Sequence, residues 1–320
     1  MAIVITGIAG FVGCNLTRSL LADGARVIGY DNLSRGSRRN IAEFESNPKF
    51  SFEQLDLNDY ERLISSISGY HLKEPITEVW HLAANSDIPA GVADAKVDLR
   101  DTFMTTFHVL EAMKEVGIPR LAFASSSAVY GDLGNVTLTE DIGPLLPISN
   151  YGAMKLASEG LISAAAEAYL ERVFIFRFPN VIGAPATHGV VYDFVKKLRA
   201  DPTKLQVLGN GTQQKSYLHV EDLVTAMIFI RDNAKDKVNY FNIGSDDEGV
   251  TVRFIAEETV AAAAPGAEVC FGEGNRGWVG DVPRFHYSID KLHALGWRSG
   301  SNSAEAMRKA IREIVKQEDL

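Results

Sequence analysis

The residues of this chain best suited to move a proton are Tyr151 and Lys155, which follow a run of three serines at positions 125–127. Residues four positions apart lie on the same face of a helix. An ammonium beside a phenol favours the phenolate and lowers the pKa of the phenol toward neutrality. A nearby hydroxyl can then complete a site for general acid–base catalysis. The pattern therefore predicts a proton-transfer site made of Tyr151, Lys155 and one serine.

The spacing by itself is weak, because Tyr192/Lys196 and Tyr287/Lys291 repeat it in the same chain. Without further context, a tyrosine at the edge of the core beside a solvated lysine is the ordinary interpretation. Two features single out Tyr151. An apolar strand over residues 121–124 leads into the serines, and a glycine-rich segment opens the chain.

The glycine-rich segment follows a short apolar run at residues 2–6, which predicts a buried strand. Gly7, Gly10 and Gly13 come next, and an amphipathic helix begins with Phe11 and Val12. Glycines permit a tight strand-to-helix turn and a close approach of the main chain to a pyrophosphate, whose charge the helix N-terminus favours. The segment therefore predicts a dinucleotide site.

Asp31 ends the second expected strand, over residues 26–30. A carboxylate at this position accepts a hydrogen bond from the ribose 2′-hydroxyl and repels a 2′-phosphate, so NAD is favoured over NADP. Arg35, Arg38 and Arg39 lie close by in sequence and could weaken that preference. The alternative for Asp31 is a turn residue. Asp56 could reach the adenine, or it could stand near the start of a helix.

Composition narrows the class of protein. The chain has 320 residues, 46% of them hydrophobic, which is enough for a large core in one or two domains. Its net charge of -9 disfavours nucleic acid and anionic membrane surfaces as partners. Cys14 and Cys270 are the only cysteines, and neither they nor the histidines have metal-ligand spacing. We expect a cytoplasmic protein without a metal site.

Strands and helices alternate along the first half of the chain, which predicts an α/β fold with a Rossmann-like, doubly wound parallel sheet. Further strands are expected near 50–54, 78–82 and 172–178, with a long amphipathic helix over roughly 97–116. Beyond 178 the alternation breaks. We expect a NAD-binding domain over 1–178 and about 217–245, and a smaller mixed α/β substrate lobe over 179–216 and 246–320.

Several segments together resemble the extended short-chain dehydrogenase/reductase superfamily, and within it the nucleotide-sugar epimerases of the UDP-glucose 4-epimerase type. They are TGIAGFVG at 6–13, DNLS at 31–34, HLAA at 81–84, SSSAVYG at 125–131, YGAMK at 151–155 and RFPNVIG at 177–183. The resemblance implies oxidation of sugar C4 to a transient ketone and its reduction from the opposite face. It also implies NAD as cofactor, a UDP-hexose as substrate and a homodimer.

Matched by position, the resemblance makes Ser126, Tyr151 and Lys155 the catalytic residues. The expected cofactor contacts are Gly7, Gly10, Phe11, Val12, Gly13, Asp31, Asn32, Asp56, Leu57, Leu82, Ala83, Ala84, Tyr151 and Lys155. The expected substrate contacts are Ser126, Tyr151, Asn180, Lys215, Arg276 and Asp281.

The chain departs from the family pattern in a few places. Asp98 stands where the family usually has an asparagine, and Pro179 replaces an aromatic residue beside the nicotinamide. Arg276 precedes Asp281 by five positions where the family has three.

Dehydratases of the family carry Asp-Glu after the catalytic hydroxyl, where this chain has Ser127 and Ala128. A 4-epimerase is therefore favoured. The alternatives are a dehydratase, a decarboxylase, a reductase, an epimerase of UDP-glucuronate or N-acetylhexosamines, and a non-catalytic NAD-binding protein.

Overall fold

The computed structural model describes residues 2–134, 136–274 and 286–320. The chain forms two compact units. The first contains Met1–Asp132, Ile142–Phe178 and Met227–Phe241, and the second contains Leu133–Asp141, Pro179–Ala226 and Asn242–Leu320. The chain passes from the first unit to the second after Phe178 and returns to the first over Met227–Phe241, and Leu133–Asp141 belongs to the second unit.

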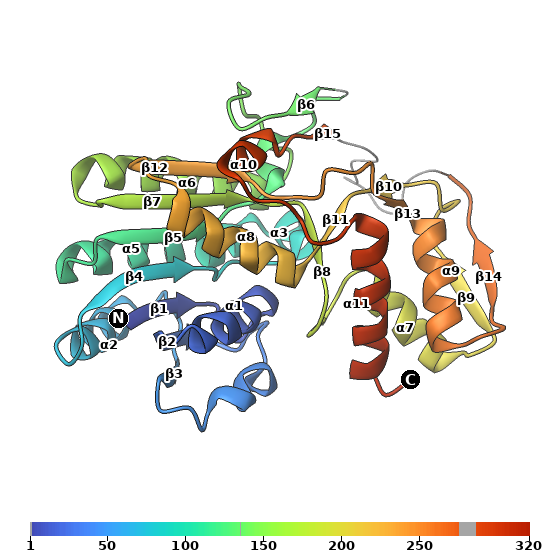
Figure 1. The fold of residues 1–320 in the computed structure, drawn as a ribbon, viewed down its shortest axis with the longest axis horizontal. Coiled ribbons are helices and arrows are strands. Elements are labelled where there is room, and N and C mark those ends of the chain that lie inside the picture. The colour runs from blue at the N-terminus through green and yellow to red at the C-terminus, as the bar shows by residue number, and fades with distance from the viewer. Residues whose placement is uncertain (1, 135, 275–285) are drawn as a thin grey trace. The chain divides into compact units, whose positions relative to one another are not determined.

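The first unit is built on a seven-stranded sheet in the order β12-β7-β5-β4-β1-β2-β3 (Figure 1). The pairings from β7 across to β3 are all parallel, which confirms the expected doubly wound sheet. The strands are β1 Ala2–Thr6, β2 Arg26–Asp31, β3 Phe50–Gln54, β4 Ile76–His81, β5 Arg120–Ala124, β7 Arg172–Arg177 and β12 Val238–Asn242.

Helices α2, α5 and α6 of this unit bury apolar side chains in a core with the strands of the sheet. The helices of the unit are α1 Phe11–Ala22, η1 Arg38–Phe44, α2 Tyr60–His71, α3 Ile88–Ala93, α4 Ala95–Asp98, η2 Leu99–Met104, α5 Thr105–Val116, η3 Ser127–Tyr130 and α6 Asn150–Ala168. A further helix, α8 Val220–Asn233, runs from the second unit into the first. None of the helices in the described part of the chain has the length and apolar character needed to span a bilayer.

The long helix expected over roughly 97–116 is present, but one of its turns is π-helical. It consists of α4, the π-helical turn η2 and α5. The hydroxyls of Thr105 and Thr106 donate to the main-chain oxygen of Thr102, at 3.1 and 2.9 Å. Such hydroxyls compete with main-chain N–H groups for helical carbonyls, which favours a widened turn. Widened turns of this kind often lie at functional sites.

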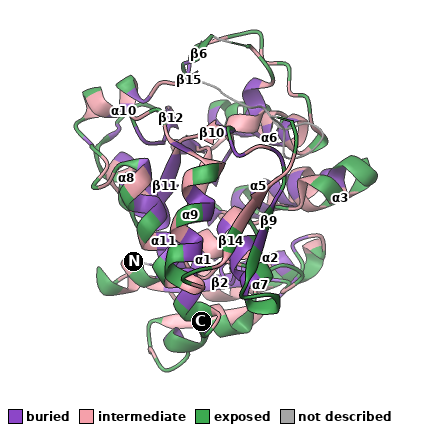
Figure 2. Cartoon of the chain, turned by 90° about the vertical axis from the view of Figure 1, so that its right-hand side faces the viewer, coloured by how far each residue is buried: buried purple, intermediate pink, exposed green. Residues whose placement is uncertain are grey.

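The second unit is a mixed α/β structure with a core of its own, as expected. Its strands form two-stranded sheets that pair β10 with β13, β11 with β8, β14 with β9 and β15 with β6. The buried face of α11 includes Met307, Ile311 and Ile314 (purple in Figure 2). The strands are β6 Thr137–Leu138, β8 Asn180–Ile182, β9 Lys204–Val207, β10 Gln214–Lys215, β11 Tyr217–His219, β13 Val250–Thr251, β14 Glu268–Phe271 and β15 His286–Tyr287; the helices are α7 Val190–Ala200, α9 Val252–Ala263, α10 Asp290–Leu295 and α11 Ser303–Gln317.

A buried ion pair ties α6 to the ends of β5 and β7. The Arg177 guanidinium donates to both carboxylate oxygens of Glu159, at 3.0 and 2.6 Å, and to the Tyr130 hydroxyl at 3.0 Å. Ser125 donates to the same carboxylate at 2.5 Å. All four residues are buried. A bidentate arginine–carboxylate pair has a fixed geometry, so it holds the residue that follows β5 against α6.

We expect Gly29→Ala to lower the melting temperature. A Cβ at Gly29 would lie 2.2 Å from Cδ1 of Ile8, whose side chain is fully buried. Overpacking of this kind costs about 1–3 kcal/mol. Gly69→Ala is the control, because no described atom lies within 4 Å of its new Cβ. That helix-interior change should leave the melting temperature unchanged or raise it. Equal effects of the two substitutions in thermal melts would contradict the packing argument.

We expect Arg177→Met to destabilise the protein strongly, because it leaves the Glu159 carboxylate buried without its cation. Removal of one partner from a buried pair costs about 3–5 kcal/mol. The double variant Glu159→Gln/Arg177→Met should recover part of that loss in urea unfolding, since neither member of the pair then carries a charge. A double variant less stable than Arg177→Met would show that the pair does not carry this energy.

Candidate nucleotide and proton-transfer site

Most of the expected cofactor residues lie at one edge of the first unit's sheet. Thr6, Asp31, His81 and Ala124 are the last residues of β1, β2, β4 and β5, and parallel strands place these carboxyl ends along the same edge. From β1 the chain runs outward to β2 and β3, then returns to β4 on the other side of β1. Such a switch point is where open α/β sheets bind ligands.

The glycine turn after β1 is crowded by main-chain atoms. Gly7 has φ +70°, and a Cβ there would lie 2.8 Å from the main-chain nitrogen of Ala83, beyond the end of β4. A Cβ at Gly13 would lie 2.2 Å from the oxygen of Gly7. Leu82 and Ala83 therefore lie against the glycine turn.

Gly10 begins α1 without a side-chain cap from any described residue, and the first turn of the helix carries no acid. Main-chain N–H groups at such a terminus are suited to an anion. Phe11 and Val12, the next two residues, are half-buried. This arrangement fits the pyrophosphate of a dinucleotide.

Asp31 is buried at the end of β2 and is held by the main chain. One carboxylate oxygen accepts from the nitrogen of Ala9 at 3.0 Å, and the other accepts from the nitrogen of Leu33 at 2.8 Å. Burial raises the pKa of Asp31, against the lowering effect of these two hydrogen bonds. A carboxylate oxygen can accept more than one hydrogen bond, so the arrangement still fits a ribose hydroxyl.

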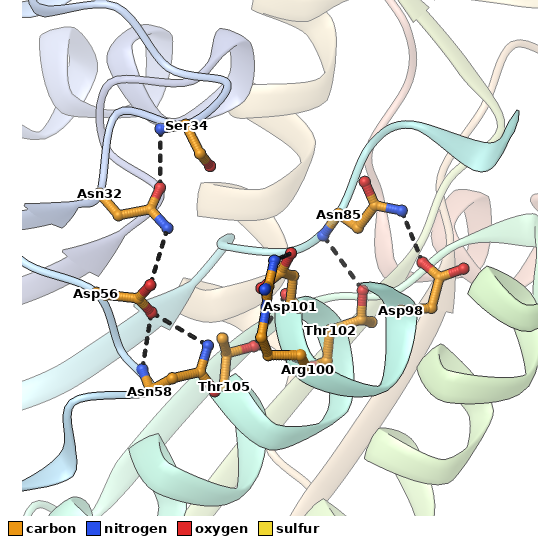
Figure 3. A network of polar contacts seen from close by, with 10 residues as sticks. All are labelled: Asn32, Ser34, Asp56, Asn58, Asn85, Asp98, Arg100, Asp101, Thr102 and Thr105. Carbon is orange, nitrogen blue, oxygen red and sulfur yellow. Dashed lines mark hydrogen bonds and ion pairs between the residues drawn. The ribbon is translucent and has the colours of Figure 1, made fainter. Parts of the chain in front are cut away.

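Asn32 and Asp56 come together at the ends of β2 and β3 (Figure 3). Asn32 donates to Asp56 at 3.5 Å, and Asp56 accepts from the main chain and side chain of Asn58 at 2.9 and 3.1 Å. Both Asn32 and Asp56 are exposed. The side chain of Leu57 is buried in the core, and its carbonyl oxygen lies 3.0 Å from Nδ1 of His108. The Leu57 side chain is therefore a packing group.

The structure brings the three expected catalytic residues together beyond β5. Ser126 and Tyr151 share a side-chain hydrogen bond, and Ser126 also accepts from the main-chain nitrogen of Ala128 at 3.2 Å. Ser149 caps α6 through the nitrogen of Gly152, at 3.1 Å, which fixes the turn that carries Tyr151. Lys155 is 2% exposed, although lysine is rarely buried.

The Lys155 ammonium is positioned by the end of β5. It donates to the carbonyl oxygen of Ala124 at 2.6 Å and lies 4.7 Å from the ring centre of Phe123. Its distance to the ring centre of Tyr151 is 5.8 Å. Burial lowers the pKa of Lys155 to about 7, against the raising effects of Glu159 and Asp98.

The sequence analysis expected Lys155 to lower the pKa of Tyr151. In the structure, burial raises the pKa of Tyr151 to about 12, the Ser126 hydrogen bond lowers it and Asp98 raises it. Desolvation of the phenolate therefore outweighs any help from Lys155, whose own charge is weakened by burial. The protein groups around Tyr151 therefore raise its pKa instead of lowering it.

His81 connects the end of β1 to helix α5 through two hydrogen bonds. Its Nδ1 lies 2.7 Å from the hydroxyl of Thr6, and its Nε2 lies 3.0 Å from the hydroxyl of Thr106. Ser158, on α6, donates to the same Thr106 hydroxyl at 3.2 Å. Burial lowers the pKa of His81 to about 3, with Lys155 acting in the same direction, so the imidazole is neutral at physiological pH.

Of the expected substrate residues, Ser126 and Tyr151 lie in the first unit, whereas Asn180 and Lys215 lie in the second. Asn180 begins β8 and pairs with Tyr217 of β11. Lys215 lies in β10, two positions before Tyr217, and pairs with Val250. Arg276 and Asp281 lie outside the described residues.

Several buried polar residues near Lys155 were not predicted from the sequence. Glu159 follows Lys155 by four positions, the same spacing that links Tyr151 to Lys155, so helical periodicity could have found it. Arg177 could not be assigned to Glu159 without the pairing of β5 and β7. Asn85 donates to Asp98 at 2.8 Å (Figure 3), a contact that no sequence signal indicated.

Comparison with known proteins agrees with this arrangement. The model of the NAD dependent epimerase/dehydratase family matches residues 3–244. A UDP-glucose 4-epimerase of Lacticaseibacillus casei is 32% identical, over 93% of this chain and 92% of the relative. A dTDP-glucose 4,6-dehydratase of Haemophilus influenzae is 28% identical, over 98% and 97%.

Among solved structures, the UDP-glucose 4-epimerase of Thermus thermophilus in complex with NAD superposes with a TM-score of 0.82 at 28% identity. It covers 98% of this chain and 99% of that one. Family match, fold and glycine turn agree, and this chain belongs to the NAD-dependent epimerase/dehydratase family of extended short-chain dehydrogenases/reductases.

Proposed function

We propose that this NAD-dependent enzyme is a nucleotide-sugar 4-epimerase that interconverts UDP-glucose and UDP-galactose. The observation that carries the proposal is the cluster beyond β5, where Tyr151 shares a hydrogen bond with Ser126 and lies beside the buried Lys155. A half-buried phenol next to a hydroxyl can accept the proton of a sugar hydroxyl and return it.

Each residue has a distinct role in this proposal. Tyr151 takes the proton from the C4 hydroxyl, directly or through Ser126, and gives it back after inversion. The Lys155 ammonium is the cation beside the phenol, and its hydrogen bond to the carbonyl oxygen of Ala124 holds it at the end of β5. Bound NAD⁺ supplies the reversible oxidation of C4. Asn180 and Lys215 are assigned to the nucleotide diphosphate, where tight binding would leave the sugar free to present either face.

The residues after Ser126 argue against a 4,6-dehydratase. Loss of water from C5 and C6 needs an additional acid and base. In this chain Ser127 and Ala128 stand where the dehydratases of the family carry Asp-Glu, and they begin the short helix η3. Neither side chain can act as a carboxylic acid. The dehydratase relative therefore does not decide the reaction, although it shares the scaffold.

The substrate test uses purified protein without added cofactor. UDP-glucose, UDP-galactose, UDP-glucuronate and the N-acetyl analogues are incubated separately and followed by NMR and mass spectrometry. The proposal predicts interconversion of the first two sugars at C4 without change in mass. Loss of water would indicate a dehydratase, and stoichiometric NADH would indicate a dehydrogenase. Light scattering of the same sample tests the proposed homodimer.

We expect Tyr151→Phe to lower kcat by about 100-fold or more, the scale associated with loss of a general base, with little change in NAD affinity. Tyr192→Phe is a matched control. Tyr192 also precedes a lysine by four positions, and Nζ of Lys196 lies 5.2 Å from its ring centre, but the pair stands on α7 in the second unit. Its kcat should be unchanged. Near-normal turnover by Tyr151→Phe would remove the central residue from the proposal.

A further inference from the structure

Asp98 is a buried carboxylate to which the proposed reaction assigns no role. It is the last residue of α4 and is 0% exposed. One carboxylate oxygen accepts from Nδ2 of Asn85 at 2.8 Å. The other, Oδ2, is buried without a hydrogen-bond partner among the residues that the structure describes. An unpaired buried carboxylate is costly unless a nearby charge compensates it.

The environment of Asp98 is closely packed. A Cβ on Gly91 would lie 1.8 Å from Oδ2, so only a glycine fits there. The carbonyl oxygen of Gly91 accepts from Nδ2 of Asn150, the residue before Tyr151. Asp98 is therefore enclosed by α3, the loop after β4 and the start of α6.

Lys155 is the buried cation that acts on Asp98. Burial raises the pKa of Asp98, Asn85 lowers it by its hydrogen bond, Asp101 raises it and Lys155 lowers it. In return, Asp98 raises the pKa of Lys155 and of Tyr151. The three groups therefore act on one another electrostatically, and Asp98 and Lys155 are both buried.

The other charged groups around Lys155 are already compensated. Glu159 has the larger effect on the pKa of Lys155, but both of its oxygens accept from Arg177. His81 is neutral. Asp101, next to Asp98 on η2, accepts from Arg100 at 2.7 Å through each of its oxygens, and Arg100 is exposed. Of the two carboxylates that act on Lys155, Asp98 is therefore the one that accepts no hydrogen bond from a cation among the described residues.

We propose that Asp98 is a positioning residue, a second counter-charge beside Glu159 that helps to keep Lys155 protonated and Tyr151 neutral in the resting site. The carboxylate acts through these two residues and does not contact the substrate. Its charge sets the pH at which the phenol can ionise. The kinetic part of this proposal rests on the proposed epimerase function, whereas the effect on Lys155 does not.

The direct test is the titration of Lys155 by NMR of 13C-lysine-labelled protein as purified, with its resonance assigned by its absence from Lys155→Arg. In Asp98→Asn the midpoint should move to lower pH, because loss of a negative charge disfavours the ammonium. Asp101→Asn removes a neighbouring, solvent-screened charge and should titrate like the wild type. Coincident midpoints in Asp98→Asn and the wild type would overturn the proposal.

The pH profile of kcat gives a second readout that a merely structural role would not move. Removal of the Asp98 charge favours the phenolate of Tyr151, so the acidic limb of Asp98→Asn should shift to lower pH, and its activity relative to the wild type should rise as pH falls. A lower plateau with an unmoved limb would mean a purely structural role. If no nucleotide sugar is turned over, the proposed function fails, while the Lys155 titration still decides the role of Asp98.

A second variant covers the case in which Asp98→Asn does not fold. Gly91→Ala keeps every charge but places a methyl group against Oδ2, so the carboxylate must move. The midpoint of Lys155 should again fall. An unchanged midpoint in folded Gly91→Ala would contradict the proposal equally.

Discussion

The arrangement of the first unit depends on one unfavourable placement, a lysine ammonium buried at the carboxyl end of β5. Lys155 is 2% exposed and has lost most of its hydration. Its compensation comes from the carbonyl oxygen of Ala124, the ring face of Phe123 and two carboxylates. A cation held in this way costs stability, and it is retained where a function requires it.

The two carboxylates near Lys155 differ in the way they are paired. Glu159 is locked to Arg177 by two hydrogen bonds, which join α6 to β7. Asp98 has a neutral partner, Asn85, and one oxygen that accepts no hydrogen bond from the described residues. Both carboxylates raise the pKa of Lys155, Glu159 more than Asp98. They differ because only Glu159 also accepts hydrogen bonds from a cation among the described residues.

The glycine turn after β1 can form only because Gly7 and Gly13 have no side chain. At Gly7 and Gly13 a Cβ would collide with main-chain atoms, so the turn can close over the ends of β1 and β4. Asp31 braces the same turn through the nitrogen of Ala9. A carboxylate expected to bind a ribose thus also holds the loop that would receive the pyrophosphate, which couples the two ends of the dinucleotide site.

Much of this protein could be predicted from short-range patterns in its sequence. Strand and helix periodicity predicted the parallel sheet, and short spacings predicted the glycine turn and the Tyr151–Lys155 face, because each depends on residues close together in the chain. The π-helical turn at Leu99–Met104 and the partners of Asp98 and Glu159 were not predictable. They depend on packing between distant segments, and so does the pKa of Tyr151, because desolvation is set by everything that surrounds a group. Sequence determined which residues could do the chemistry; tertiary structure decided how each charge is balanced.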